Sequence, residues 1–272
     1  MNNGKKSSKA KTVNTEKCVE EFQVTDRFKK MMVKALKAVM IILKKRAEML
    51  KVENWGDNEK QEFLEIFGIK YDTVITIDSE EEKKKVKKED PETHRDPYIE
   101  KRENITAYQF MKEGVDRMIV ICEHLKVKDP VNGNERIHGN FVNLTDDDQA
   151  TANVPADQTL SLSLDLYETT LKINIFQHFV CKPLTGVESQ VSSLCHELSH
   201  YYRSSENGKY GGMGTDDMPT KGGFSRGKNY LGTARNLRNN GNQYVFKNAY
   251  NVEKYFCLGL TDEEKAVVEN KE

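Results

Sequence analysis

The sequence predicts an α+β fold in which N-terminal helices precede a small sheet and a buried helix. Two periodicities predict this class. Between Thr25 and Leu50 the apolar residues recur at steps of three and four, which is the pattern of an amphipathic helix. Between Arg136 and Phe179 apolar and polar residues alternate in three segments, which is the pattern of strands. A further helix is expected to begin near residue 186, directly after those strands.

The remaining elements follow from capping residues and from the same two periodicities. Asp57 is expected to cap a helix that ends at Gly68, because a left-handed residue commonly closes a helix. The other expected segments are a strand at Tyr71–Ile77, a helix at Ala107–Leu125, strands at Phe141–Asn143, Leu160–Leu166 and Leu171–Phe176, and helices at about Leu231–Phe256 and Asp262–Asn270. The predicted organisation is a disordered tail (1–15), an N-terminal helical region (16–70) and one larger domain (71–272).

Charge and hydropathy exclude two classes of partner. The chain has 42 basic and 43 acidic residues, so its net charge gives no reason to expect binding to nucleic acid or to anionic lipid. Its strongest apolar run, Ala38–Leu43, is far shorter than the roughly 20 residues that a membrane-spanning helix needs. We therefore expect no nucleic-acid partner and no membrane insertion.

The termini and the cysteines bear on the compartment. The first dozen residues are polar and basic without an apolar stretch behind them, which is unlike a secretory signal peptide. The five cysteines are scattered and lack C-x-x-C spacing, so neither a complete disulfide framework nor a cysteine zinc cluster is expected. A reducing compartment fits this pattern most easily. The sequence predicts a cytoplasmic protein, or one secreted by a route without a classical signal peptide.

The chemistry of the chain is concentrated in the helix expected near residue 186, where Thr185 and Glu188 have capping-box spacing. His196 and His200 are four residues apart, which places both imidazoles on one side of a helix at the separation needed by two ligands of a tetrahedral ion. Glu197 lies beside them. This H-E-x-x-H arrangement is typical of peptidases in which zinc acidifies a water while the glutamate acts as general base.

A third protein ligand has to come from elsewhere in the chain. A glycine and a third histidine following directly would define one class of zinc peptidase, but Tyr201–Glu206 excludes it. Two acidic alternatives stay open at this point. One is Glu253, on a later helix, and the other is the acidic turn Gly214–Asp217.

The chain resembles the deuterolysin and peptidyl-Lys metallopeptidase family, the aspzincins. The resemblance covers Pro183–His200, the G-T-x-D motif at Gly214–Asp217 and, more weakly, Asn248–Phe256. It implies a zincin-like fold for residues 71–272 and zinc bound by His196, His200 and the last aspartate of the motif. That aspartate is Asp217, and its nearest rival is Asp216. A bacterial effector-like member is the closest description.

Two departures from the family pattern affect the other site residues. The family has a tyrosine that stabilises the oxyanion where this chain has Thr220, so Tyr230 is the nearest equivalent, with Tyr201, Tyr202 and Tyr210 as alternatives. In lysine-specific members an aspartate and a glutamate bind the substrate lysine. Here Tyr250 replaces that aspartate and Glu253 remains, so Glu253 is expected to bind substrate without lysine specificity.

The predicted function is a zinc-dependent metalloendopeptidase acting on protein or peptide substrates, with Glu197 as general base. A catalytically inactive zinc-containing binding module is the alternative, favoured by the missing family tyrosine. A third hypothesis, compatible with the first, is a toxin or effector whose N-terminal helices dock to a carrier or inhibitor protein.

Overall fold

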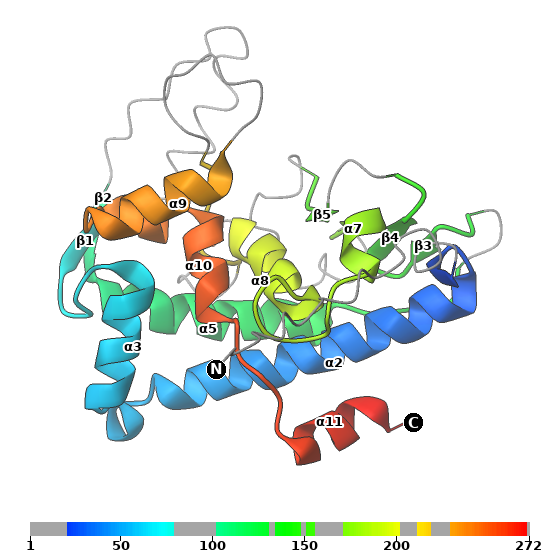
Figure 1. Cartoon of the computed structure of the whole chain (residues 1–272), viewed down its shortest axis with the longest axis horizontal. Helices are drawn as coiled ribbons and strands as arrows, with labels where there is room; N and C mark the ends of the chain where they lie inside the picture. The colour runs from blue at the N-terminus through cyan, green and yellow to red at the C-terminus, as the bar shows by residue number, and fades with distance from the viewer. Residues whose placement is uncertain are drawn as a thin grey trace, which may run out of the picture.

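A computed structural model describes residues 21–78, 102–130, 134–147, 151–155, 171–201, 211–218 and 229–270, and these form an α+β fold (Figure 1). The helices are α2 (Thr25–Met49), α3 (Asp57–Phe67), α5 (Ala107–His124), α7 (Gln177–Val180), α8 (Gln190–His200), α9 (Tyr230–Asn239), α10 (Ala249–Tyr255) and α11 (Asp262–Glu269), with 3₁₀ turns η1 (Val52–Asn54) and η3 (Gln243–Phe246). The strands are β1 (Val74–Asp78), β2 (Arg102–Thr106), β3 (Ile137–His138), β4 (Phe141–Leu144), β5 (Ala152–Asn153) and β6 (Ile173–Phe176). The predicted tail (1–15) and the predicted strand at 160–166 lie outside the described residues.

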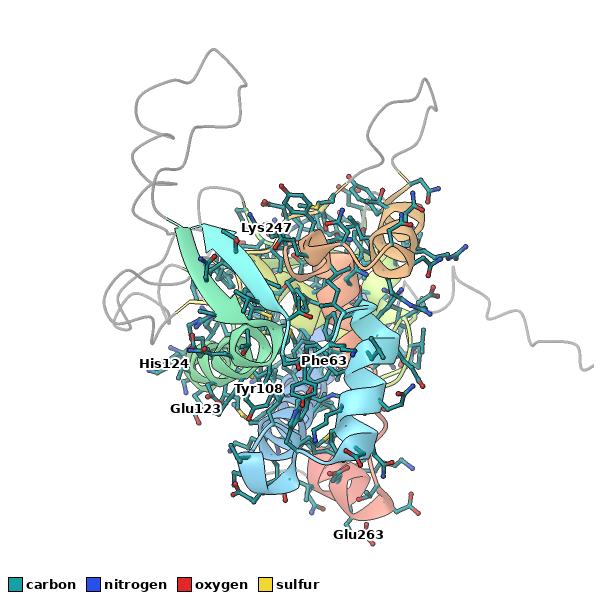
Figure 2. All side chains as sticks on the ribbon, turned by 90° about the vertical axis from the view of Figure 1, so that its left-hand side faces the viewer. Phe63, Tyr108, Glu123, His124, Lys247 and Glu263 are labelled. Carbon is teal, nitrogen blue, oxygen red and sulfur yellow. The ribbon has the colours of Figure 1, made fainter. Side chains whose placement is uncertain are left out.

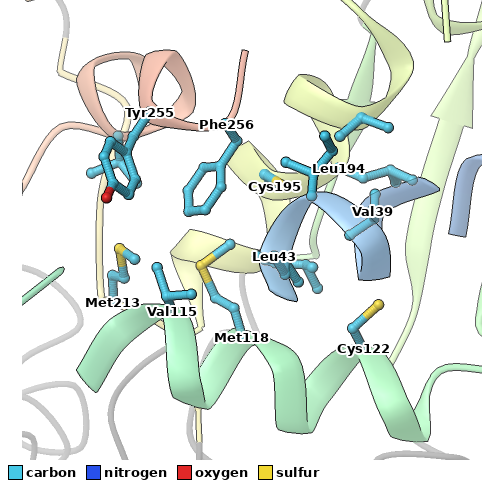
Figure 3. Packing of buried hydrophobic residues seen from close by; sticks show 14 of the residues in the cluster. Val39, Leu43, Val115, Met118, Cys122, Leu194, Cys195, Met213, Tyr255 and Phe256 are labelled. Carbon is cyan, nitrogen blue, oxygen red and sulfur yellow. The ribbon is translucent and has the colours of Figure 1, made fainter. Parts of the chain in front are cut away.

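The long helix α2 runs between α8 and α11 (Figure 1). Its apolar stripe is buried, as the helical periodicity predicts, and contacts α5, α8 and α11. Figure 3 shows Val39 and Leu43 of α2 in one cluster with Met118 of α5 and Leu194 of α8. The buried residues of α2 therefore belong to the same hydrophobic cluster as those of α5 and α8.

A buried arginine connects α2 to the C-terminal part of the chain. Arg46 of α2 donates two hydrogen bonds of 2.8 Å to the carboxylate of Glu62 in α3. Its Nε donates to the backbone carbonyl of Tyr255, and its guanidinium lies 4.0 Å from the centroid of the Tyr255 ring. Arg46 is only 1% exposed, so this network holds the C-terminal end of α10 against α2 and α3.

Aromatic packing joins α3 to α5. Phe63 and Tyr108 lie on facing sides of these two helices (Figure 2), and the Trp55 ring contacts both, with centroid distances of 5.9 and 4.9 Å. The helix α3 runs from Asp57 to Phe67 and is closed by Gly68, whose φ of 69° is left-handed, as predicted, but its N-cap is Gly56 rather than Asp57. Before α5 the chain forms the antiparallel pair β1–β2. The strand β2 was not predicted from the sequence, and β1 begins at Val74 rather than Tyr71.

The second sheet has the strand order β3-β4-β6-β5. The strands β4 and β6 are parallel, whereas β3 and β5 pair antiparallel at the two edges. Buried and partly exposed residues alternate along β4 and β6, which confirms the predicted strand periodicity there. The edge strand β5 lies against α8, so this contact places the sheet beside the helix that carries His196, Glu197 and His200.

The C-terminal part differs from the prediction of one helix over about 231–256. It contains α9, the turn η3 and α10 in place of a continuous helix. The break follows Asn239, where Gly241 adopts a left-handed φ of 57° and closes α9. Among the described helices none is long and apolar enough to cross a bilayer.

The cysteines are in two chemical states. Cys122, Cys195 and Cys257 are free thiols, and burial raises the pKa of the Cys122 thiol to about 12. Cys181 is disulfide-bonded, and its partner lies outside the described residues.

Candidate metal centre and active site

The helix α8 begins later than the sequence pattern predicts. Gly186 and Glu188 have positive φ angles of 100° and 51°, which no α-helix contains, so the predicted start near residue 186 is wrong. The capping box is formed instead by Ser189 and Ser192. Each hydroxyl accepts a hydrogen bond of 3.0 Å from the backbone N–H of the other residue. Val187 consequently lies outside the helix and is 74% exposed.

Burial of α8 brings its polar residues together inside the molecule. Leu194, Cys195 and Leu198 are buried in the core, while His196 and Glu197 are each only 6% exposed. The rings of His196 and His200 lie 4.9 Å apart between centroids, and one ligand atom from each of these histidines and from Glu197 lies within 4.8 Å of the others. The helical spacing of the motif thus produces the predicted grouping of side chains, which could hold a metal ion.

The acidic turn is attached to the C-terminal end of α8 by backbone hydrogen bonds. The amides of Gly212 and Gly214 donate to the Tyr201 carbonyl, and those of Met213 and Thr215 donate to the Ser199 carbonyl, at 2.9–3.1 Å. A Cβ at Gly212 would lie 2.3 Å from the Leu198 carbonyl oxygen, so only glycine permits this approach. The turn is therefore fixed relative to the two histidines.

Asp217 is the acidic residue that this turn brings to the histidines. Its Oδ1 lies 3.0 Å from His196 Nε2 and 3.9 Å from His200 Nε2. The neighbouring Asp216 is used differently, because its backbone pairs with Lys247 and Ala249 at the start of α10 and its side chain is exposed. Of the two aspartates, Asp217 is thus the one whose carboxylate lies near both Nε2 atoms.

Both histidines are held through the ring nitrogen that faces away from Asp217. His200 Nδ1 lies 2.9 Å from the Thr215 carbonyl oxygen, which can only accept, so Nδ1 carries the proton and Nε2 presents its lone pair. His196 Nδ1 lies 3.2 Å from Glu253 Oε2, and the other oxygen of Glu253 accepts from Ser192 Oγ at 2.8 Å. Glu253 therefore contacts the outer side of His196 and is not placed as a third ligand.

The charges of the site favour a cation. Burial alone would lower the pKa of His196, but hydrogen bonds to Asp217 and Glu253 and the charge of Glu197 raise this pKa to about 10. Burial raises the pKa of Glu197, an effect that the two histidines oppose. Three carboxylates thus surround two imidazoles. Two histidine nitrogens and one carboxylate oxygen form a donor set of the kind that holds catalytic zinc, so the residues present fit this ion.

Glu197 is also fixed by the sheet. The backbone N–H of Val154, the residue after β5, donates to Glu197 Oε2 at 3.0 Å. This bond orients a carboxylate that is otherwise buried, and it places the edge of the sheet directly beside the histidines.

A stack of aromatic rings lies on the α10 side of the site. The Tyr250 ring packs edge-on against His196 with a centroid distance of 4.7 Å, and Tyr230 stacks on Tyr250 at 5.2 Å with an interplanar angle of 14°. Burial, reinforced by the carboxylates of Asp217 and Glu253, raises the pKa of the Tyr250 phenol, which therefore stays protonated. Tyr201 is buried in the core, whereas Tyr202, Tyr210 and Thr220 lie outside the described residues.

No family model, curated protein or solved structure matches this chain. The aspzincin resemblance thus stays a prediction from the motifs around His196 and Asp217.

Three contacts of the site were missed by sequence reasoning. Tyr250 was noted only as a departure from the family, although its spacing from Glu253 places the two on one face of α10. That spacing is a signal that could have identified it. The Thr215 carbonyl and the Val154 N–H have no such signal, because every residue carries these backbone groups.

Proposed function

We propose that this protein is a zinc-dependent metalloendopeptidase with a zincin-like fold, in which His196, His200 and Asp217 hold the ion. The observation that carries the proposal is the convergence of two Nε2 atoms and Asp217 Oδ1, while both Nδ1 atoms are engaged by acceptors on the outer side. Asp217 is 41% exposed, so this side of the site is open to solvent and to a substrate.

Glu197 is the proposed general base. A zinc ion bound there would acidify a water molecule and polarise the scissile carbonyl. Burial raises the pKa of Glu197 above its usual value, which makes its carboxylate a stronger proton acceptor. The Val154 N–H holds Oε2, so the other oxygen takes the proton from the attacking water and later delivers it to the leaving amine.

A phenol hydroxyl from the tyrosine stack is the proposed oxyanion donor. Tyr230 was predicted for this role, and Tyr250 is a second candidate because its ring touches His196. A neutral phenol next to the reacting carbonyl would donate a hydrogen bond to the negative oxygen as it forms. The raised pKa of Tyr250 favours this neutral form.

The alternative, an inactive zinc-containing binding module, would keep the ligands and lose turnover. The position of Glu197 within the histidine group argues against it, because a general base is needed there for turnover and not for holding the ion. The disulfide at Cys181 favours a secreted effector over a cytoplasmic enzyme. A carrier or inhibitor partner remains part of that effector hypothesis, although the packing of α2 in the core leaves it less free to dock.

Mass spectrometry of a peptide mixture incubated with the zinc-loaded protein tests the proposal. Glu197→Gln should bind the same amount of zinc and cut about 10²–10⁴-fold more slowly, because it removes only the general base. Glu263→Gln, at an exposed position on α11 (Figure 2), is the matched control and should cut like the wild type. If the wild type binds zinc and produces no new peptide termini, the binding-module alternative replaces the peptidase.

A further inference from the structure

Basic residues are concentrated in the part of the chain that contains α9. From Met218 to Val252 the sequence has six basic residues and no acidic one, although the whole chain has 42 basic and 43 acidic residues. The six are Lys221, Arg226, Lys228, Arg235, Arg238 and Lys247, of which the first three lie outside the described residues. The rest of the chain therefore has more acidic than basic residues. A local excess of one charge creates a field that the net charge of the whole chain does not show.

Two of these arginines form one basic surface with a lysine of α10. Arg235 and Arg238 are three residues apart, so they lie on the same side of α9, and both are exposed. The helix α9 packs against α10 (Figure 1), where the Asn251 side chain donates to the Ala234 carbonyl at 2.9 Å. Burial lowers the pKa of Lys254 on α10, and the positive charges of Arg238 and Arg235 lower this pKa further. The three cations are thus close enough to repel one another.

Nothing in the described part of the chain neutralises this basic surface, since no carboxylate there forms an ion pair with any of the three side chains. Glu253, the neighbour of Lys254, directs its carboxylate to His196 instead. Helix dipoles account for part of the charge, because Arg238 and Lys254 lie in the last turns of α9 and α10. They do not account for Arg235, which lies before the last turn and adds to the repulsion.

Carboxylates are the anions that fit this basic surface best. A guanidinium binds a carboxylate through two parallel N–H···O bonds. Arg235 and Arg238 are separated by about 4.5 Å along the helix axis, and alternate side chains of an extended peptide by about 6.5 Å, so a few acidic residues cover the surface. A nucleic acid would extend beyond it over the rest of the chain, whose acidic excess repels phosphates.

We propose that the basic surface formed by Arg235, Arg238 and Lys254 binds an acidic segment of a partner protein. The carboxylates of such a segment would relieve the repulsion among the three cations. The attraction acts between exposed groups, so it is strongest at low ionic strength. The proposal concerns binding alone and does not depend on the peptidase function.

The test measures the fluorescence anisotropy of a labelled peptide of alternating Glu and Gly residues, beside a peptide in which Gln replaces Glu. All proteins are the full chain with Glu197→Gln, so that binding is read without turnover. Only the Glu peptide should bind, and its Kd should rise about tenfold between roughly 20 and 200 mM salt. Arg235→Glu combined with Arg238→Glu should raise Kd by about tenfold or more, whereas lysine at both positions should keep Kd within about threefold.

The matched control is Lys30→Glu combined with Lys44→Glu, since both lysines are exposed on α2 and the change in net charge is the same. This control should leave Kd within about twofold. An equal loss in the control would show attraction to the protein as a whole, and binding that survives the double reversal on α9 would place the peptide elsewhere. Either result overturns the proposal, as does a failure of the Glu peptide to bind at low salt.

Two further measurements separate the remaining explanations. A labelled oligonucleotide that binds more tightly than the Glu peptide, and through the same arginines, would assign the basic surface to nucleic acid and overturn the proposal. Thermal unfolding shows whether each variant stays folded. If the double reversal on α9 lowers the unfolding temperature and no variant differs in peptide binding, the arginines serve only the ends of their helices.

Discussion

The two halves of the candidate metal centre orient their histidines by different means. On the α10 side, His196 is held by a side chain, the carboxylate of Glu253. On the side of the acidic turn, His200 is held by a backbone group, the carbonyl of Thr215. The same helix thus carries one ligand whose support depends on residue type and another whose support depends on the path of the chain.

This difference determines which substitutions affect the site. The Glu253 carboxylate disappears when the residue is replaced, whereas the Thr215 carbonyl survives any substitution that leaves the turn in place. The acidic turn itself is held by backbone hydrogen bonds to the carbonyls of Ser199 and Tyr201 and by the close approach of Gly212 to α8. The support of His196 is therefore lost by substitution of one residue, Glu253. The support of His200 is lost only when the whole turn is disrupted.

The largest effect is expected at Asp217, where the two halves meet. Asp217→Ala removes a proposed zinc ligand, so zinc affinity should fall by more than about 100-fold and peptidase activity should be lost. Loss of a residue that only hydrogen-bonds to a ligand typically lowers metal affinity by about 10–100-fold. Asp216→Ala, one residue earlier, should change zinc affinity by less than about threefold, because only its backbone is used. Competition with a fluorescent chelator measures both affinities. Equal losses in the two variants would show that Asp217 is not the third ligand.

A smaller effect is expected at Glu253. Glu253→Gln replaces the charged acceptor of His196 Nδ1 by an amide, so zinc affinity should fall about 10–100-fold while the metal still binds. The fall should be larger than in Ser192→Ala, which removes only the hydroxyl that supports Glu253. The same chelator competition orders the three proteins. Unchanged zinc affinity in Glu253→Gln would show that the Glu253 carboxylate does not support His196 as a ligand.

Sequence reasoning was most successful where local spacing determines geometry. The spacing of His196 and His200 fixes their common face on any helix, and the periodicity of residues 25–50 fixes α2. The acidic turn was found only through a family motif, since nothing in its spacing from α8 shows that it returns to the histidines. Its approach depends on backbone hydrogen bonds formed only in the folded chain.

Expectations failed where backbone conformation overrides side-chain pattern. Thr185 and Glu188 have capping-box spacing, yet the left-handed conformations of Gly186 and Glu188 delay the helix to Gln190. The apolar pattern over 231–256 is similarly interrupted at Gly241. The elements that cover α2 could not be predicted either, because periodicity shows which face of a helix is buried but not what packs on it.

A still smaller effect on zinc affinity is expected when the hydrogen-bond network around Arg46 is changed. Glu62→Gln leaves the buried guanidinium without its carboxylate, which should lower the free energy of unfolding by about 2 kcal/mol, since Glu62 is itself one-third exposed. Zinc affinity should fall by less than about tenfold, because Asn251 still ties α10 to the Ala234 carbonyl. Urea unfolding and chelator competition give the two quantities. Loss of zinc binding with an unchanged free energy of unfolding would contradict the expectation that Glu62 affects stability more than zinc affinity.

The smallest effect on zinc is expected at Thr215, where the support is backbone. Thr215→Val keeps the β-branched shape and the carbonyl that accepts from His200 Nδ1, so zinc affinity should stay within about twofold of the wild type. Stability should nevertheless fall by about 1 kcal/mol, because the 2.6 Å contact between the Thr215 and Ser199 hydroxyls is lost in a buried setting. Chelator competition and urea unfolding on the same samples separate these outcomes. The contrary outcome is a fall in zinc affinity as large as that of Glu253→Gln. It would mean that the Thr215 hydroxyl, rather than the backbone of the acidic turn, orients His200. The distinction between side-chain and backbone support would then not hold.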